Sequence, residues 1–88
     1  MFEWDDVKAK KNETKHSVSF IFATRAFDDE NRITVIDNRF DYDEVRYITL
    51  ARIDQRVYVL VYTTRGRVIR LISARKANSK EVKRYDNR

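Results

Sequence analysis

Three strand-like runs separated by two-residue turns restrict the fold more than any other feature of this sequence. They are rich in β-branched and aromatic residues and comprise Val45–Ile53, Arg56–Thr64 and Arg67–Arg75. Connections this short join neighbouring antiparallel strands, because parallel strands need a crossover of about a dozen residues. Arg65-Gly66 holds the only glycine, which supplies the positive φ of a tight hairpin, whereas Asp54-Gln55 is a weaker turn pair. We therefore expect an antiparallel meander whose second register is the firmer one.

Alternation within the three runs divides their side chains between two faces of a sheet. One face is aliphatic and carries Ile48, Leu50, Val57, Val59, Val61, Val68, Ile72 and Ala74. The other face is aromatic and polar, with Tyr47, Thr49, Ala51, Tyr58, Leu60, Tyr62, Ile69, Leu71, Ser73 and Arg75. We expect helices on the aliphatic face, and we expect the second face to be partly open or covered only by a C-terminal helix.

Capping residues and apolar spacing predict the remaining elements. The expected bounds are a short strand at Phe2–Asp5, a helix from Asp5 or Asp6 through Lys15, a helix capped by Ser17 or Ser19 that ends at Asp28–Asn31, a strand at Arg32–Ile36, an acidic loop at Asp37–Glu44 and a helix at Ser79–Asn87. The predicted fold class is α+β, an antiparallel sheet with two N-terminal helices on one face and a C-terminal helix.

Composition limits what else the chain can be. Its 88 residues suit one small domain, residues 1–88, and the absence of cysteine excludes disulfides and thiolate metal sites. A single histidine excludes the usual zinc clusters. The longest purely apolar run, Val57–Tyr62, has six residues, too few to span a membrane. Glu3, Asp5 and Asp6 are unlike the positive start of a secretory signal, so we expect a cytoplasmic protein without cofactors.

Charge is distributed unevenly along the chain. The net charge is +5 overall, but residues 65–88 carry a net +7 and residues 28–44 a net −5. A basic C-terminal quarter beside an acidic segment is typical of proteins that bind polyanions, nucleic acid above all. The alternative is that these lysines and arginines only solvate a surface helix and strand.

Several segments together resemble the BrnT family of toxins from bacterial type II toxin–antitoxin systems. They are Phe2-Glu3-Trp4-Asp5, Asn12, Lys15-His16, Val18-Ser19-Phe20, Phe27-Asp28-Asp29, Glu44-Val45-Arg46-Tyr47, Tyr62-Thr63, Ile69 to Ala77, Glu81 and Tyr85. The resemblance covers essentially the whole chain, and the run from Ile69 to Ala77 is its most specific part. Ser17 and Ala51 stand where the family usually has glycine, which affects turn and strand geometry more than chemistry.

The resemblance implies a fold similar to the RelE ribonuclease toxins, which cleave RNA without a metal and so inhibit translation. It also implies a cognate antitoxin, a small DNA-binding protein that masks the toxin and represses its operon. No membrane and no metal are expected among the partners. Tyr85 is implied as a site residue, since RelE-type toxins use a C-terminal tyrosine.

Metal-free RNA cleavage requires cations that stabilise charge on the phosphoryl oxygens. Arginine suits this role, because its planar fork donates two hydrogen bonds to one phosphate and does not lose its charge. We expect Arg75 and Arg70 to act in this way, with Arg46 as a further clamp. In a regular strand Arg70 and Arg75 lie on opposite faces, and a bulge or a strand end near Ser73 would bring them together. Alternatively, Arg70 forms a salt bridge to the acidic segment, and Arg46 pairs with Glu44 or Asp43.

Other candidates also have competing interpretations. Imidazole suits proton transfer near neutral pH, yet His16 stands at a predicted helix end, where histidine commonly meets the last carbonyls. Tyr85 can stack on a base or dock the last helix on the sheet. Lys76, Lys80, Lys83 and Arg84 are expected to bind RNA.

The acidic loop has enough carboxylates for Mg²⁺ but no spacing that demands it, so we predict no metal site. A strict Mg²⁺ requirement would turn attention to Asp37, Asp41 and Asp43. The sequence leaves two other functions open, a non-catalytic RNA- or DNA-binding module and a scaffold that binds only protein.

Overall fold

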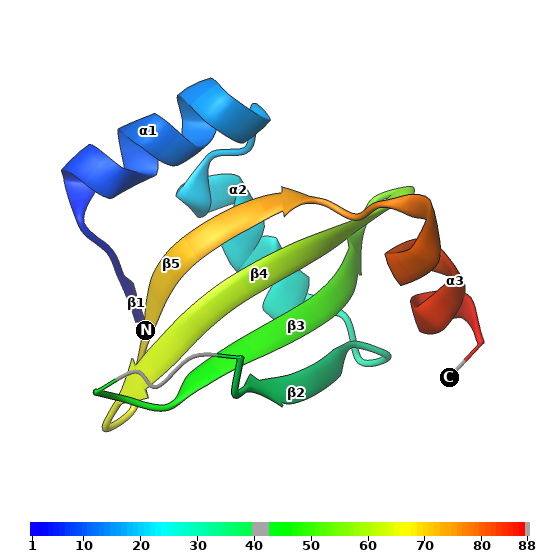
Figure 1. Ribbon diagram of the computed structural model, residues 1–88. Helices are drawn as coiled ribbons and strands as arrows, with labels where there is room; N and C mark the ends of the chain where they lie inside the picture. Colours follow the sequence, from blue (N-terminus) through cyan, green and yellow to red (C-terminus); the bar gives the residue numbers. More distant parts are fainter. Residues whose placement is uncertain (40–42, 88) are drawn as a thin grey trace.

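The computed structural model describes residues 1–39 and 43–87, which form a five-stranded sheet with helices on both faces (Figure 1). In chain order the elements are β1 (Phe2–Glu3), α1 (Asp6–His16), α2 (Phe20–Ala23), the 3₁₀ helix η1 (Thr24–Asp28), β2 (Ile33–Asp37), β3 (Arg46–Ile53), β4 (Arg56–Arg65), β5 (Val68–Lys76) and α3 (Ser79–Asp86). The predicted α+β class is confirmed. Within these residues, no helix has the length and apolar character needed to cross a bilayer.

The sheet is mixed, and in this respect the prediction of an antiparallel sheet was wrong. Its strand order is β1-β5-β4-β3-β2, and β1 runs parallel to β5, with Phe2 opposite Ile69 and Glu3 opposite Arg70. The other neighbours are antiparallel. Strands joined by short turns have to be antiparallel, whereas β1 meets β5 from the far end of the chain, where no local turn sets its direction.

The first hairpin of the meander has the predicted turn, and the turn of the second hairpin is shifted by one residue. In the first, Ile53 lies opposite Arg56, so Asp54-Gln55 is the turn as expected, and Asp54 takes a φ of 55°. In the second, Arg65 lies opposite Val68, which moves the two-residue turn one position along the chain, to Gly66-Arg67. Gly66 has a φ of 61°, the left-handed conformation for which a glycine was expected here.

A β-bulge interrupts the pairing of β4 with β5. Val61 lies opposite Ser73, but the next residue, Tyr62, lies opposite Leu71, so Ile72 is an extra residue in β5. One extra residue reverses which face each later side chain occupies. Ala74 therefore shares a face with Leu60, and Arg75 shares the opposite face with Val59.

The larger core lies on the aromatic face of the sheet, which we call the helix-covered face. There α2, η1 and part of α1 bury Val18, Phe20, Ala23 and Ala26 against Ala51, Ile53, Tyr58, Leu60, Tyr62, Leu71 and Ala74. The expectation that the N-terminal helices cover the aliphatic face was wrong. Four alanines in this cluster have no exposed surface, which allows helix and sheet to approach closely, and the large rings of Tyr58 and Tyr62 fill the space around them.

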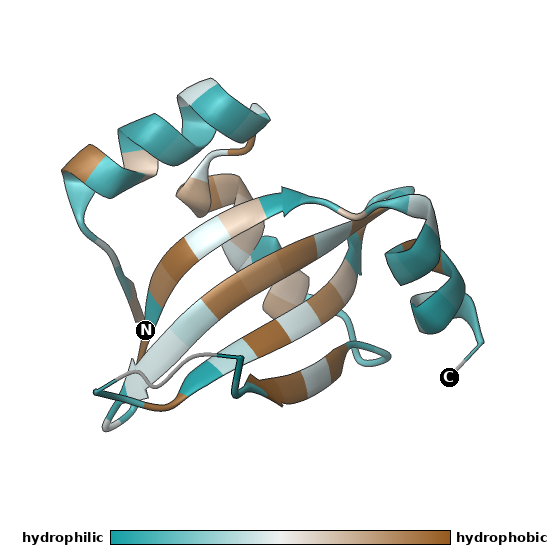
Figure 2. Cartoon of the chain, in the orientation of Figure 1, coloured by the Kyte–Doolittle hydropathy of each residue, from teal (hydrophilic) through white to brown (hydrophobic). Residues whose placement is uncertain are grey.

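The aliphatic face is covered at one end by α3. Tyr85, Val82 and Ala77 pack against a second cluster formed by Leu50, Val57 and Val59 on β3 and β4. Figure 2 shows α1 and α3 as largely hydrophilic helices beside strands with long apolar stretches. The predicted C-terminal helix thus exists with nearly the expected bounds, but it covers the aliphatic face.

Helix ends follow the predicted capping residues. Asp5 caps α1 by accepting a hydrogen bond from the Lys8 amide at 3.0 Å, and this bond lowers the pKa of Asp5. Ser19, the second of the two predicted serines, caps α2 by accepting from the Phe22 amide at 3.1 Å. Ser17 instead ends α1 in the left-handed conformation with a φ of 59°. The second predicted helix is shorter than expected and continues as the 3₁₀ helix η1.

Candidate nucleic-acid interface

A row of side chains crosses the face of the sheet opposite α2. The registers place Glu3 beside Arg70, Arg70 beside Thr63 and Asp37 beside Arg46. Arg46 and Thr63 adjoin the pair Tyr47–Tyr62, so they are the next pair in that ladder. Residues paired across strands point to the same side of a sheet, and all five strands therefore contribute to one row.

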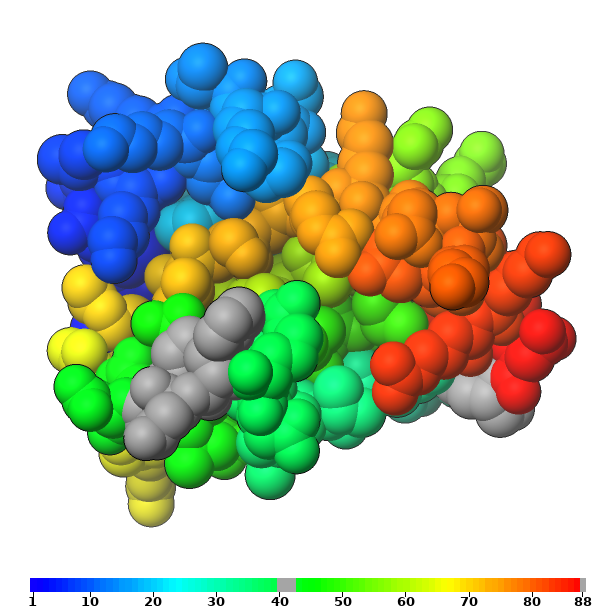
Figure 3. Space-filling model, in the orientation of Figure 1, coloured from blue at the N-terminus to red at the C-terminus, as the bar shows by residue number. Residues whose placement is uncertain are grey.

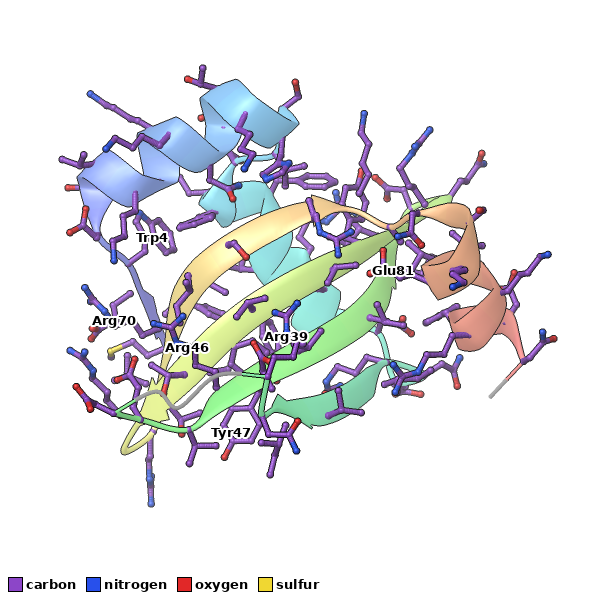
Figure 4. All side chains as sticks on the ribbon, viewed as in Figure 1. Trp4, Arg39, Arg46, Tyr47, Arg70 and Glu81 are labelled. Atoms are coloured by element: carbon purple, nitrogen blue, oxygen red, sulfur yellow. The ribbon has the colours of Figure 1, made fainter. Side chains whose placement is uncertain are left out.

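Arg75 lies on the same face as this row because of the Ile72 bulge. We call this surface, defined by Arg46, Arg70 and Arg75, the arginine face. Figure 4 shows Arg46 and Arg70 in front of the sheet, together with Arg39 from the segment after β2 and Glu81 from α3. The bulge that the sequence left as an open possibility is present. The expectation that Arg75 lies on the face with the tyrosines was wrong, because the bulge moves it to the opposite face.

Carboxylates hold three of the guanidinium groups on this side of the sheet. Arg70 Nη1 donates to Glu3 Oε2 at 2.5 Å, so its partner comes from β1 and not from the acidic segment. Arg39 donates from Nε and Nη2 to the two oxygens of Asp37 at 2.8 and 3.0 Å. The Asp37 side chain is only 1% exposed, so a buried carboxylate holds the guanidinium group of the surface residue Arg39 in place.

Arg75 is held by Glu81 in a bidentate pair. Nη1 donates to Oε1 and Nη2 donates to Oε2, both at 2.8 Å. Glu81 is itself fixed, because Asn78 and Glu81 form a capping box at the start of α3. The pair raises the pKa of Arg75 and lowers the pKa of Glu81, in each case mainly through their hydrogen bonds.

Arg75 retains donors beyond this pair. A guanidinium has five N–H groups, and Nη1 uses its second one on the Lys76 carbonyl at 3.3 Å. Glu81 and Lys76 together occupy three donors, which leaves one on Nη2 and the one on Nε. The side chain is 38% exposed.

Ser73 lies between the two arginines of β5. Arg70 precedes it by three residues and Arg75 follows it by two, or about 10 Å and about 7 Å along a strand. Ser73 also borders a cavity of about 250 Å³ between α1 and β5, and His16 lines that cavity. His16 is in the last turn of α1 and is half-buried. Ser73 thus lies between Arg70 and Arg75 along β5 and shares a cavity with His16.

Tyr85 lies in the second core cluster and is 4% exposed. Its hydroxyl donates to Asp29 Oδ2 at 2.6 Å, and the Arg52 guanidinium lies over its ring at 5.4 Å from the centroid. The sequence left two interpretations of Tyr85 open, and its buried position matches the one in which it docks the last helix on the sheet. Its ring face is not available to stack on a base.

The other predicted RNA-binding residues are exposed, but they lie on two different surfaces of the protein. Lys80, Lys83 and Arg84 recur at i, i+3 and i+4 on α3, on the side away from Val82 and Tyr85. Lys76 ends β5 opposite Tyr58, so it belongs to the helix-covered face. The α3 residues thus form an exposed basic stripe beside Arg75.

The acidic candidates lie apart from one another. Asp37 is buried beside Arg39, Asp43 is exposed, and Asp41 lies outside the described residues. In residues 1–39 and 43–87, no group of three or more histidine, aspartate or glutamate side chains is arranged to hold a metal ion.

Sequence reasoning missed Arg39, Glu81 and the lysines of α1 as parts of this surface. The spacing of Lys8, Lys11 and Lys15 was a usable signal, since i, i+3 and i+7 share one side of a helix. Arg39 lies two residues after its partner Asp37, and Asn78 and Glu81 have the spacing of a capping box, but neither local pattern shows that the side chain lies on this side of the sheet.

Residues 4–81 match a family described as "Ribonuclease toxin, BrnT, of type II toxin-antitoxin system". The match begins just after β1, ends in the first turn of α3 and includes the whole arginine face except for the Glu3 end of its row. No curated protein is a significant match for the chain.

Proposed function

The chain belongs to the BrnT family of ribonuclease toxins of type II toxin–antitoxin systems, and on this premise we propose that it is a metal-independent endoribonuclease that acts at its arginine face. Cleavage of cellular RNA would inhibit translation until a cognate antitoxin covers the enzyme. The observation that carries the proposal is the Ile72 bulge, because without it Arg75 would lie on the opposite side of the sheet from Arg46 and Arg70.

In the proposed reaction the RNA backbone crosses β5 with a phosphate above Ser73. A base removes the proton from the ribose 2′-hydroxyl, the 2′-oxygen attacks the adjacent phosphorus, and the bond to the 5′-oxygen breaks. An acid returns a proton to that leaving oxygen, so the products are a 2′,3′-cyclic phosphate and a 5′-hydroxyl. His16 is our candidate for one of these proton transfers, because imidazole ordinarily exchanges protons near neutral pH.

The arginines would carry the charge that develops on the phosphoryl oxygens. Arg75 has two remaining donors, and Glu81 fixes its orientation before the substrate arrives. Arg70, held by Glu3, would approach from the other side of Ser73, and Arg46 would extend the cationic surface along the row. Guanidinium groups that are already oriented cost little reorganisation when the transition state forms.

Metal independence follows from this assignment. Glu3, Asp37 and Glu81 each bind an arginine, so they support cations and are poorly suited to hold Mg²⁺ at the same time. The test is incubation of the purified protein with RNA, with and without EDTA. We expect equal cleavage rates and 5′-hydroxyl products. A strict Mg²⁺ requirement would contradict the proposed chemistry, and RNA binding without any cleavage would identify a non-catalytic binding module instead.

A further inference from the structure

Helix α1 lies where β5 has no strand neighbour. β1 pairs with β5 only at Ile69 and Arg70, so the β5 edge further along needs another partner. Asn12 supplies it, because its Oδ1 accepts from the Ala74 amide at 3.1 Å and its Nδ2 donates to the Ala74 carbonyl at 2.8 Å. Nδ2 also donates to the Val18 carbonyl at 3.1 Å. This buried amide fixes α1 alongside the bulge.

The groove between α1 and β5 is basic. Lys8, Lys11 and Lys15 line it from the helix, and His16, Ile72 and Ser73 complete it. No ion pair joins any of the three lysines to a carboxylate within residues 1–39 and 43–87, whereas Arg70 and Arg75 are both paired. The groove therefore holds three exposed lysine side chains, of which Lys8 is partly compensated by the Asp5 carboxylate.

The opposite side of α1 has a different character. Asp6, Lys10 and Glu13 line a separate cavity against Trp4, Phe20 and Ile21. The acidic residues of the helix thus gather on the side away from the lysine row. Figure 3 shows α1, β5 and α3 side by side on one surface of the molecule, which is also the side that carries the arginine face.

We propose that the α1–β5 groove is a second binding site for the phosphodiester backbone of single-stranded RNA, continuous with the arginine face through Ser73. The inference rests on the proposed function, since it extends the substrate path beyond the phosphate that is cleaved. Ser73 borders both surfaces, so a strand lying across β5 can pass from Arg75 into the lysine row without crossing a carboxylate of α1. Lysines along a groove neutralise phosphates without reading bases, so the site contributes affinity and no sequence preference.

The test compares salt dependence of RNA binding for the parent and the variant Lys8→Ala/Lys11→Ala/Lys15→Ala. The probe is a 2′-O-methyl single-stranded oligonucleotide, which binds but lacks the nucleophile for cleavage. Each lost phosphate contact lowers the slope of log affinity against log salt by about 0.7 for single strands, so the triple variant should lose about 2. The affinity ratio of parent to variant should then shrink roughly a hundredfold between about 0.1 M and about 1 M salt.

Matched single variants control for net charge. Lys10→Ala and Lys11→Ala remove the same charge from adjacent positions of one helix, but only Lys11 lines the groove. Alanine is a good helix former, so α1 should persist in both, and thermal unfolding checks this. We expect a reduced slope for Lys11→Ala and the parent slope for Lys10→Ala.

Unchanged slope in the triple variant would overturn the inference, and so would equal losses in the Lys10 and Lys11 variants. A triple variant that binds RNA like the parent but loses affinity for the antitoxin would also overturn it, because the groove would then be a protein interface. A parent protein that binds the probe with the expected lysine dependence yet never cleaves unmodified RNA would leave the groove supported and refute the ribonuclease reaction instead.

Discussion

At the scale of single residues, Arg70 and Arg75 are held by carboxylates before any substrate is present. The bidentate pair with Glu81 orients Arg75, and a donor aligned in advance stabilises charge that exists only in the transition state. We expect Arg75→Ala to slow single-turnover cleavage at saturating RNA about a hundred- to thousandfold, with a much smaller effect on RNA affinity. Arg75→Lys should restore only part of the rate, because an ammonium does not reproduce the fork.

Arg25 provides the matched control for this substitution. It also forms a bidentate pair, with Asp54, at 2.7 and 3.3 Å, but η1 carries it on the other side of the sheet. Arg25→Ala removes a comparable ion pair, so its thermal unfolding should resemble that of Arg75→Ala while cleavage continues at the parent rate. A folded Arg75→Ala protein with the parent rate would remove Arg75 from the mechanism and leave Arg70 and Arg46.

At the scale of secondary-structure elements, the Tyr85 hydroxyl adds a polar contact to the apolar packing that docks α3 on the sheet. Tyr85 joins the end of α3 to Asp29 just after η1, two segments that are far apart in the chain. Tyr85→Phe keeps the ring in the cluster with Leu50 and Val59 but leaves Asp29 with one hydrogen bond fewer. We expect a loss of about 1.5–3 kcal/mol in the free energy of unfolding, the usual range for a hydrogen bond to a charged group.

The same variant separates a structural role of Tyr85 from a catalytic one. Because the ring is buried, Tyr85→Phe should cleave RNA at the parent rate wherever the protein is folded. Chemical denaturation and single-turnover cleavage are the two measurements. A variant with parent stability but a greatly reduced rate would restore Tyr85 as a candidate proton donor.

At the scale of the whole molecule, the arginine face, the lysine groove and the basic stripe of α3 lie on or beside one surface, and this concentrates positive charge where RNA would bind. We propose that the cognate antitoxin inhibits the toxin by covering this surface with carboxylates. RNA and antitoxin should then compete in a titration of labelled RNA, more sharply at low salt. Undiminished RNA binding in a saturated toxin–antitoxin complex would refute this mode of inhibition.

Local sequence pattern was sufficient for most elements and for their type. Alternation predicted the three long strands, side-chain caps at Asp5 and Ser19 predicted helix starts, and a lone glycine marked the second hairpin. Each of these depends on contacts within a few residues of the chain, and such contacts can be counted from the sequence. The basic surplus and the family resemblance were likewise visible in the sequence, and the family match confirms the resemblance.

The arrangement of the site was decided only in the folded protein. Ile72 is an apolar β-branched residue like Ile69, so its type does not mark it as the extra residue of β5, which only the pairing with β4 shows. The bulge places Arg75 on the face of Arg70 and Ala74 under the helices. A one-residue change of register moves every later side chain of the strand to the opposite face of the sheet. The energy of that change depends on contacts across the entire sheet, and a local sequence pattern does not contain those contacts.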